Sequence, residues 1–279
     1  MSPLMAAHPF WAGLKPTLHI SHRGGAALAP ENTLAAFRRA VREYHTDMLE
    51  LDLHLTRDGA LVVFHDETLE RCTDGAGRVA ERSLAELEEL DAGYRFATEG
   101  GGRFPFRGQG VKIPTFREVV AAFPGLRLNV ELKASSAQAC EAFAREFRAL
   151  DAWGQICCGS EQDAVAEQLQ QELPDACHFY PRASLTALVM AIKLGEPPDL
   201  DERFTVLDMP WSYEGELLVD EAFLQATGAL KKWVNVWTVD DAPSMRAAVK
   251  LGVGGIITDR PDRLRAVLDS KGRLESRRP

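Results

Sequence analysis

The 279-residue sequence has few cysteines and no long hydrophobic run. Its five cysteines are odd in number and lack paired-motif spacing, so we expect buried, reduced thiols and neither a disulfide framework nor a zinc site. The longest apolar stretch, residues 187–192, is far too short to span a bilayer. The N-terminal residues have no basic segment followed by an apolar core, so no signal peptide is predicted. We therefore expect a cytoplasmic protein without stable membrane insertion.

Positive charge is also scarce. Lys and Arg number 32 against 41 Asp and Glu, which gives a net charge of −9 and argues against broad binding to nucleic acid. An anionic small molecule would need a local positive centre. The hydrophobic share of 46% and the charged share of 26% are ordinary for a soluble globular protein. The length suits a large α/β domain, and the composition does not predict an oligomeric state.

The most informative stretch is Met48–Leu55, which alternates strictly between leucines and polar residues. Such alternation predicts a β-strand with Leu49, Leu51 and Leu53 on one side. Glu50 and Asp52 then share the other side, roughly 6–7 Å apart along the strand, where both carboxylates can reach one hard cation. An ordinary half-buried strand that shows its polar side to water is the alternative.

Apolar runs alternate with helical patterns along the rest of the chain. Strands are expected at residues 18–22, 48–55, 126–132, 155–159, 177–180, 205–209, 234–239 and 255–258. About eight strands, each followed by a helix, predict a (β/α)₈ TIM barrel of the α/β class. A doubly wound sheet is the alternative, but His22-Arg23-Gly24-Gly25 does not match the dinucleotide-binding glycine pattern.

The predicted barrel domain covers residues 17–269. Glycines crowd residues 67–112, which we interpret as a small inserted subdomain after the second strand. The apolar run at residues 61–64 precedes this insertion, and residues 1–16 are expected to form an irregular lead-in because prolines interrupt them.

The strand at residues 126–132 carries a second set of polar groups. Asn129, Glu131 and Lys133 alternate with apolar residues and should face the barrel interior, because helices cover the outside of a barrel. Glu50, Asp52 and Glu131 would then share one cavity, where unneutralised carboxylates repel one another. A bound Mg²⁺ or Ca²⁺ relieves this repulsion with oxygen-only ligands. The alternative is a structural network in which Lys133 and Arg23 neutralise the acids.

Two histidines stand near this acidic cluster. His22 ends the first strand and is followed by Arg23, while His65 ends the run at residues 61–64. A cation and an arginine hold phosphate oxygens, and two imidazoles act as proton donor and acceptor. The sequence therefore indicates a phosphoryl-transfer site.

The motifs of the chain, taken together, resemble those of the glycerophosphodiester phosphodiesterase family. They are His22-Arg23-Gly24, Pro30-Glu31-Asn32-Thr33, Glu50-Leu51-Asp52, Thr56-Arg57-Asp58-Gly59, His65-Asp66, Glu131-Leu132-Lys133, Trp237-Thr238-Val239 and Thr258-Asp259-Arg260-Pro261. The resemblance extends from His19 to Pro261. The insertion resembles the family's small inserted segment, through motifs such as Thr68-Leu69-Glu70-Arg71. Cys72 and Phe116 depart from the family pattern, at positions without a proposed chemical role.

The resemblance implies a metal-dependent hydrolase that cuts glycerophosphodiesters into an alcohol and sn-glycerol 3-phosphate. It implies His22 and His65 as catalytic acid and base, and Arg23 and Lys133 as phosphate-binding groups. It implies Glu50, Asp52 and Glu131 as ligands of one divalent cation, Mg²⁺ or Ca²⁺. Trp237 would wall the substrate pocket near the glycerol.

Two other functions remain open at this point. A lysophospholipase D would need an apolar groove, for which Phe96, Phe104 and Phe106 of the insertion are candidates. A non-catalytic phosphodiester-binding protein would be expected to lack one of the catalytic groups, and here all are present. Of the other histidines, His54 is expected to be a satisfied core residue, and His19 to lie in the barrel floor.

Overall fold

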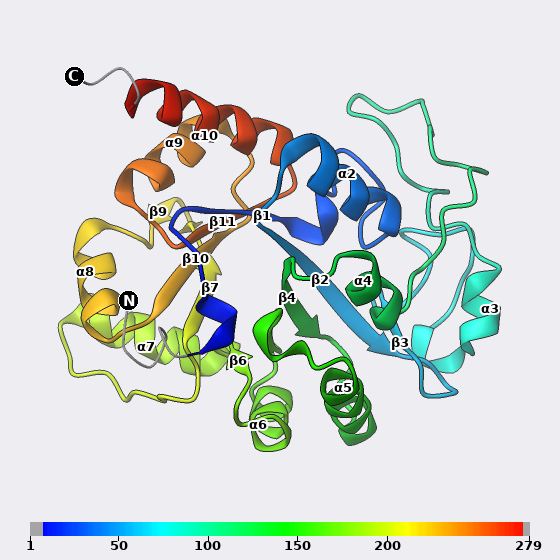
Figure 1. Ribbon diagram of the computed structural model, residues 1–279, viewed down its shortest axis with the longest axis horizontal. Coiled ribbons are helices and arrows are strands. Elements are labelled where there is room, and N and C mark those ends of the chain that lie inside the picture. Colours follow the sequence, from blue (N-terminus) through cyan, green and yellow to red (C-terminus); the bar gives the residue numbers. More distant parts are fainter. Residues whose placement is uncertain (1–7, 276–279) are drawn as a thin grey trace.

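The computed structural model describes residues 8–275. Within this range eight parallel strands form the wall of a barrel, as expected, with helices around its outside (Figure 1). The barrel strands are β1 (Leu18–Ser21), β2 (Met48–Leu55), β4 (Arg127–Leu132), β5 (Ile156–Gly159), β6 (Cys177–His178), β7 (Val206–Pro210), β10 (Trp233–Trp237) and β11 (Gly255–Thr258). This arrangement confirms the predicted α/β barrel.

The barrel closes unevenly around its circumference. Neighbouring strands pair in the order β6-β5-β4-β2-β1-β11-β10-β7, and β2 and β4 pair along six residues. The seam between β6 and β7 consists of one bridge, Phe179 to Val206, with flanking hydrogen bonds from Tyr180 N to Val206 O (2.8 Å) and from Thr205 N to His178 O (2.9 Å). The barrel is therefore nearly closed, and β6 is its weakest strand.

The outer helices follow the strands in chain order. They are α2 (Leu34–Tyr44), α4 (Phe116–Ala122), α5 (Ala137–Ala149), α6 (Asp163–Glu172), α7 (Arg182–Leu194), α8 (Glu221–Ala229), α9 (Ala242–Leu251) and α10 (Pro261–Glu275). Several begin with a side-chain cap: the hydroxyl of Thr33 accepts a hydrogen bond from Ala36 N, and Thr115 forms a capping box with Glu118. None of the described helices is long and apolar enough to cross a membrane.

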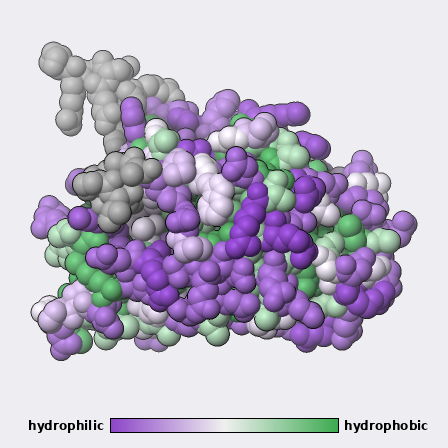
Figure 2. Space-filling model, turned by 60° about the horizontal axis from the view of Figure 1, so that its bottom comes forward, coloured by the Kyte–Doolittle hydropathy of each residue, from purple (hydrophilic) through white to green (hydrophobic). Residues whose placement is uncertain are grey.

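The leucine side of β2 packs outward against these helices. Leu49, Leu51 and Leu53 are fully buried and form one apolar cluster with side chains such as Phe37 of α2 and Phe143 of α5. The leucine face of β2 therefore points toward the helices, as the alternation predicted. The outer surface in Figure 2 is mainly hydrophilic, with smaller hydrophobic patches among the charged residues.

Residues 61–112 depart from the regular barrel. The predicted apolar run forms β3 (Leu61–Val63), which pairs antiparallel with β2 and does not join the barrel. The insertion follows β3, contains α3 (Leu84–Glu88) and the 3₁₀ turn η3 (Val79–Glu81), and lies at one edge of the molecule (Figure 1). Its own small core includes Leu69, Val79 and Leu87. The proposed division into a domain of residues 17–269 with an insertion at 67–112 stays a prediction.

The described part of the lead-in, residues 8–16, is irregular as expected apart from one 3₁₀ turn, and residues 1–7 lie outside the described range. The 3₁₀ turn η1 (Pro9–Trp11) buries Phe10 and Trp11 against barrel-interior residues such as Leu18 and Met48. Arg127, at the start of β4, donates a hydrogen bond to Phe10 O at 2.6 Å. The prolines and glycines of this segment leave no periodic pattern, so the sequence did not predict that Phe10 and Trp11 close the N-terminal end of the barrel.

Candidate active site

The C-terminal ends of the strands enclose a cavity of about 750 Å³. Every site residue predicted from the sequence lines it: His22, Arg23, Glu50, Asp52, His65, Glu131, Lys133 and Trp237. These residues come from five places along 216 positions of the chain. The structure thus brings together the groups that the sequence pattern singled out.

The two acidic strands lie next to each other in the barrel wall. Asp52 of β2 pairs in register with Glu131 of β4, and Glu50 pairs with Asn129. The Lys133 ammonium lies 2.7 Å from Glu131 Oε2 and 3.5 Å from Asp52 Oδ1, so it bridges the two carboxylates. This contact agrees in part with the alternative of a charge-neutralising network.

The electrostatics show that this neutralisation is incomplete. Burial and the nearby charge of Asp52 raise the pKa of Glu50 to about 8. Burial also raises the pKa of Glu131 to about 7, although Lys133 acts in the opposite direction. Burial opposes ionisation of Asp52 as well, but Lys133 and Arg23 keep its pKa below the usual value. Two of the three acids therefore lack sufficient positive charge around them.

The donor chemistry of this cluster fits a hard divalent cation, since it offers only carboxylate oxygens. Across the described residues, however, no group of three or more His, Cys, Asp or Glu side chains is arranged to hold a metal ion. Lys133 bridges two of the predicted ligands instead. The predicted ligands share a cavity without forming a finished coordination shell.

Arg23 lies in the turn η2 (His22–Gly24), which directly follows β1. Its backbone has a left-handed φ of 50°, and its N–H donates to Glu50 Oε2 at 2.9 Å. Its guanidinium lies 3.0 Å from Glu31 and 3.3 Å from Asp52. Gly24 is required next to it, because a Cβ there would lie 2.8 Å from atoms of Ala36 and Phe37.

Each of the two predicted catalytic histidines has a carboxylate partner. His22 Nδ1 lies 2.7 Å from Asp259 Oδ1, and His65 Nδ1 lies 2.7 Å from Asp66 Oδ1. The carboxylates hold the proton on Nδ1 and leave Nε2 of each ring for proton exchange. Burial lowers the pKa of His22, but Glu50 and Asp259 outweigh this effect and raise it to about 8.

The opposite part of the cavity wall is apolar. We call this the apolar side; it consists of Phe179, Leu185, Val189, Met190, Met209, Tyr213, Leu218 and Trp237. Helix α7 and the small hairpin of β8 (Ser212–Tyr213) and β9 (Glu216–Leu217) contribute to it or adjoin it. Three of its side chains are well exposed at the mouth: Met190 (52%), Tyr213 (62%) and Trp237 (36%).

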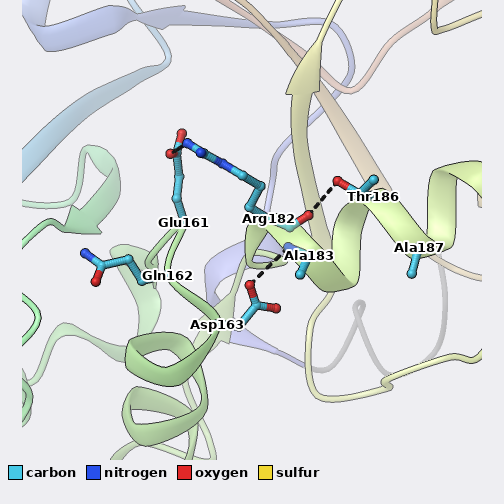
Figure 3. A pocket seen from close by; sticks show the side chains of 7 residues that line it. All are labelled: Glu161, Gln162, Asp163, Arg182, Ala183, Thr186 and Ala187. Atoms are coloured by element: carbon cyan, nitrogen blue, oxygen red, sulfur yellow. Dashed lines mark hydrogen bonds and ion pairs between the residues drawn. The ribbon is translucent and has the colours of Figure 1, made fainter.

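A second, shallower hollow adjoins the cavity beside the start of α7 (Figure 3). Glu161, Arg182 and Thr186 line both hollows, and Glu161 forms an ion pair with Arg182 between them. The Glu161 N–H donates to Glu131 Oε1 at 3.3 Å. This ion pair marks the boundary of the cavity on the side of α6 and α7.

Comparison with protein families decides the assignment of the chain. The sequence profile of the glycerophosphoryl diester phosphodiesterase family matches residues 22–263. The chain belongs to this family. It is therefore a phosphodiester hydrolase by descent as well as by the composition of its site.

Individual family members agree with this assignment. A glycerophosphodiester phosphodiesterase of Caldanaerobacter subterraneus is 33% identical over 252 residues, which cover 89% of this chain and 96% of the relative. Human lysophospholipase D is 28% identical, with coverage of 90% and 85%. An Oleispira antarctica phosphodiesterase, solved in complex with the product sn-glycerol-3-phosphate, superposes with a TM-score of 0.70 at 26% identity, with coverage of 91% and 97%.

The family barrel is also seen in a more distant structure. The glycerophosphoryl diester phosphodiesterase domain of a Mycobacterium tuberculosis protein superposes with a TM-score of 0.80 at 22% identity, and covers 91% of this chain and 99% of that domain. At this identity the likeness concerns the fold. It confirms the (β/α)₈ architecture of this family member.

Some expectations about other residues need correction. His19 was expected in the barrel floor, but it points outward, where Arg265 and Tyr44 are its neighbours; burial and then Arg265 lower its pKa to about 4. Phe96 and Phe106 pack edge to face against each other, and Phe104 lies under Arg107. These insertion aromatics are absent from the described lining of the cavity. His54 is the satisfied core residue that was predicted, since its Nε2 bonds to His65 O.

Sequence reasoning assigned no role to several residues of this family member's site. Asp66 and Asp259 were quoted only as motif letters, and Asp208 and Glu161 were not considered. A usable signal existed for Asp259, because it directly follows β11 at the end of the barrel where active sites lie. Glu161 directly follows Ser160 at the end of β5 and could have been found by the same rule.

Proposed function

We propose that the chain is a cation-dependent hydrolase that cuts glycerophosphodiesters into an alcohol and sn-glycerol 3-phosphate. One observation carries the proposal: two carboxylate-oriented histidines, two cationic side chains and three carboxylates line the same 750 Å³ cavity. The glycerol phosphate bound to the Oleispira antarctica relative supports the identity of the product.

Glu50, Asp52 and Glu131 would hold one Mg²⁺ or Ca²⁺. Two of these acids have raised pKa values because they are buried with too little positive charge nearby, which is the condition that a hard cation corrects. The bound cation would supply Lewis-acid polarisation of a phosphoryl oxygen.

Arg23 and Lys133 would hold the phosphate. Both cationic side chains lie beside Asp52, so a phosphodiester bound against Arg23 and Lys133 meets positive charge from the ends of both β1 and β4. Arg23 is held by its backbone bond to Glu50 and by Glu31, which limits the positions that its guanidinium can take. Such prior positioning lowers the entropic cost of reaching the reactive arrangement.

His22 and His65 would exchange the protons. Each ring has its Nδ1 fixed by a carboxylate, so Nε2 is the atom that faces the reaction. One imidazole would accept the proton of the attacking group, either water or the neighbouring glycerol hydroxyl, and the other would donate a proton to the departing alcohol oxygen. Trp237 would form part of the wall against which the glycerol lies.

The direct test is product analysis. Purified protein incubated with glycerophosphocholine and a divalent cation should release choline and sn-glycerol 3-phosphate, measured with an enzyme-coupled assay. Chelation should abolish the release, and addition of Mg²⁺ or Ca²⁺ should restore it. Folded, cation-supplied protein that releases no glycerol phosphate from substrates with any headgroup would contradict the proposal.

The apolar side of the cavity favours a second candidate substrate class, the lysophospholipids. Leu185, Val189 and Met190 of α7 line the cavity, and they offer one acyl chain the apolar contact that a deacylated headgroup does not need. Human lysophospholipase D, a relative at 28% identity, supports this candidate. The apolar side includes residues of α7 and none of the insertion aromatics that the sequence suggested for an acyl-chain groove.

A charge placed in the apolar side should distinguish the two substrate classes by their turnover rates. Met190→Glu should lower turnover of lysophosphatidylcholine by about tenfold or more and leave turnover of glycerophosphocholine near the wild-type rate. Leu194→Glu is the matched control, since Leu194 is 64% exposed on the same helix but is absent from the described lining. Equal rates of Met190→Glu and wild type on the acylated substrate would exclude binding of the acyl chain along the apolar side.

We also propose a cytoplasmic location. All five cysteines are free, and four of them are buried. Unpaired thiols are typical of a reducing compartment. Fractionation of cells that express the full-length protein, followed by immunoblotting, tests this proposal.

A further inference from the structure

Arg71 lies in the insertion, outside the described set of cavity-lining residues, yet it contacts Glu31 and Asp66, the carboxylate partners of Arg23 and His65. Its Nη1 and Nη2 donate to the two oxygens of Glu31 at 2.6 and 2.7 Å. Its Nε and Nη2 donate to the two oxygens of Asp66 at 2.6 and 2.9 Å. One guanidinium therefore forms two bidentate pairs with carboxylates that are distant in sequence.

The pair with Asp66 leads to His65. Asp66 Oδ1 accepts hydrogen bonds from both Arg71 Nη2 and His65 Nδ1. Arg71 thus fixes the plane of the carboxylate that fixes the imidazole. A rotation of Asp66 would turn the His65 ring and misdirect its Nε2.

The pair with Glu31 leads to Arg23. Glu31 Oε1 accepts from both Arg71 Nη2 and Arg23 Nη1, the latter at 3.0 Å. Arg23 itself has a left-handed backbone and contacts Asp52 with its Nε. Glu31 therefore holds the phosphate-binding guanidinium toward the acidic strand, and Arg71 holds Glu31.

The geometry demands arginine at this position. Four donated hydrogen bonds to two carboxylates use the planar, forked arrangement of a guanidinium, which an ammonium group cannot reproduce. Arg71 keeps 47% of its side chain exposed, so its ion pairs are expected to add little to overall stability. Their main effect is on the orientation of the groups that they join.

We propose that Arg71 is a positioning residue that holds His65 and Arg23 together in the reactive arrangement, an inference that rests on the function proposed above. It touches neither substrate nor cation and acts through Asp66 and Glu31. The insertion consequently takes part in catalysis by supplying the connection between a proton-transfer group and a phosphate-binding group.

The test compares Arg71→Ala with wild type on glycerophosphocholine under saturating cation. We expect kcat to fall about 10–100-fold, as is usual when a partner that orients a site residue is lost, and the melting temperature to stay near that of wild type. Added guanidinium chloride at millimolar concentration should restore part of kcat in Arg71→Ala and none in His65→Ala. Arg71→Lys should stay impaired, because it keeps the charge and loses the fork.

The matched control is Arg78→Ala. Arg78 lies in the same insertion, is 55% exposed, and pairs with Glu67 at 2.9 Å, and no side-chain hydrogen bond or ion pair of the described residues joins either of them to His22 or His65. It should keep wild-type kcat. Glu31→Gln and Asp66→Asn separate the two connections, and they serve as the test if Arg71→Ala does not fold: the first should mainly raise KM, and the second should mainly lower kcat.

The outcomes separate this inference from the proposed function. A wild-type protein without activity on any glycerophosphodiester refutes both. An active wild type with unchanged kcat in Arg71→Ala refutes only the positioning role. So does a loss of kcat that guanidinium does not restore and that accompanies a lower melting temperature, because this is the behaviour of a purely structural residue.

Discussion

The two sides of the cavity are built in opposite ways. The polar side, which consists of His22, Arg23, Glu50, Asp52, His65, Glu131 and Lys133, is held by hydrogen bonds and ion pairs from several elements. The apolar side relies on packing along α7, β7 and the β8–β9 hairpin, and it leaves Met190 and Tyr213 more than half exposed. Chemistry requires fixed groups, whereas a variable headgroup or chain requires only a surface to lie against.

Loss of a histidine should have the largest effect. His22→Ala and His65→Ala should each lower kcat by about 10²–10⁴-fold, because each removes a proton-transfer group from the polar side. Calorimetric titration with the cation should show near-normal affinity in His22→Ala. A histidine variant that keeps kcat but loses the cation would mean that the roles on the polar side are misassigned.

Neutralising a ligand should have the next largest effect. Glu50→Ala should weaken cation binding by roughly 10–100-fold, since it removes a carboxylate from the only cluster proposed to hold the ion. Asp208→Asn provides a comparison, because Asp208 lines the same cavity but is partnered by Asn129 and Asn235. Equal weakening by both changes, measured by calorimetry, would place the ion elsewhere in the cavity.

Changes on the apolar side should act more gently on a small substrate. Trp237→Ala should raise KM for glycerophosphocholine by about 2–10-fold, as expected for loss of one aromatic contact, with kcat changed much less. Trp237→Phe should recover most of the KM. Steady-state kinetics measure both constants. A loss of kcat as large as that of the histidine variants would contradict the distinction between a catalytic polar side and a substrate-contacting apolar side.

The smallest effect concerns acid stability. Hydrogen bonds from Arg71 lower the pKa of Asp66 to about 2. A carboxylate whose folded pKa lies below its unfolded value of about 4 stabilises the protein at higher pH, and this stabilisation is lost as the pH falls from about 4 to 2. Asp66→Asn should therefore melt at most roughly 2–4 °C below wild type at neutral pH. Thermal melts should show this gap closing towards pH 2, and a constant gap would contradict the assignment.

The polar side was largely predictable from the sequence because it depends on local regularity. Strict alternation in β2 and β4 assigned Glu50, Asp52 and Glu131 to the interior, and the βα rhythm placed the strand ends together. His22 needed only the rule that barrel sites lie after the strands. The eight-stranded barrel followed from the same periodicity.

The rest depends on contacts that no local pattern encodes. The link of Arg71 to Glu31 joins residues 40 positions apart and arises only when the insertion folds back on the turn after β1. Phe10 and Trp11 are positioned by packing against residues of the barrel floor that are distant in sequence. The apolar side combines α7 with strand ends further along the chain. His19 was misplaced because β1 begins with buried residues on both faces, which removes the alternation signal.

Phe10 and Trp11 fill the N-terminal end of the barrel, which bears on the direction of product release. With the N-terminal end of the barrel closed by these two rings, the described cavity opens at the opposite end, beside Met190 and Tyr213. A glycerol phosphate held by Arg23 and Lys133, beside the buried Asp52, would then leave after the alcohol and through the same opening. Product release would then be ordered, and we expect glycerol phosphate to inhibit competitively with the substrate and the alcohol not to do so.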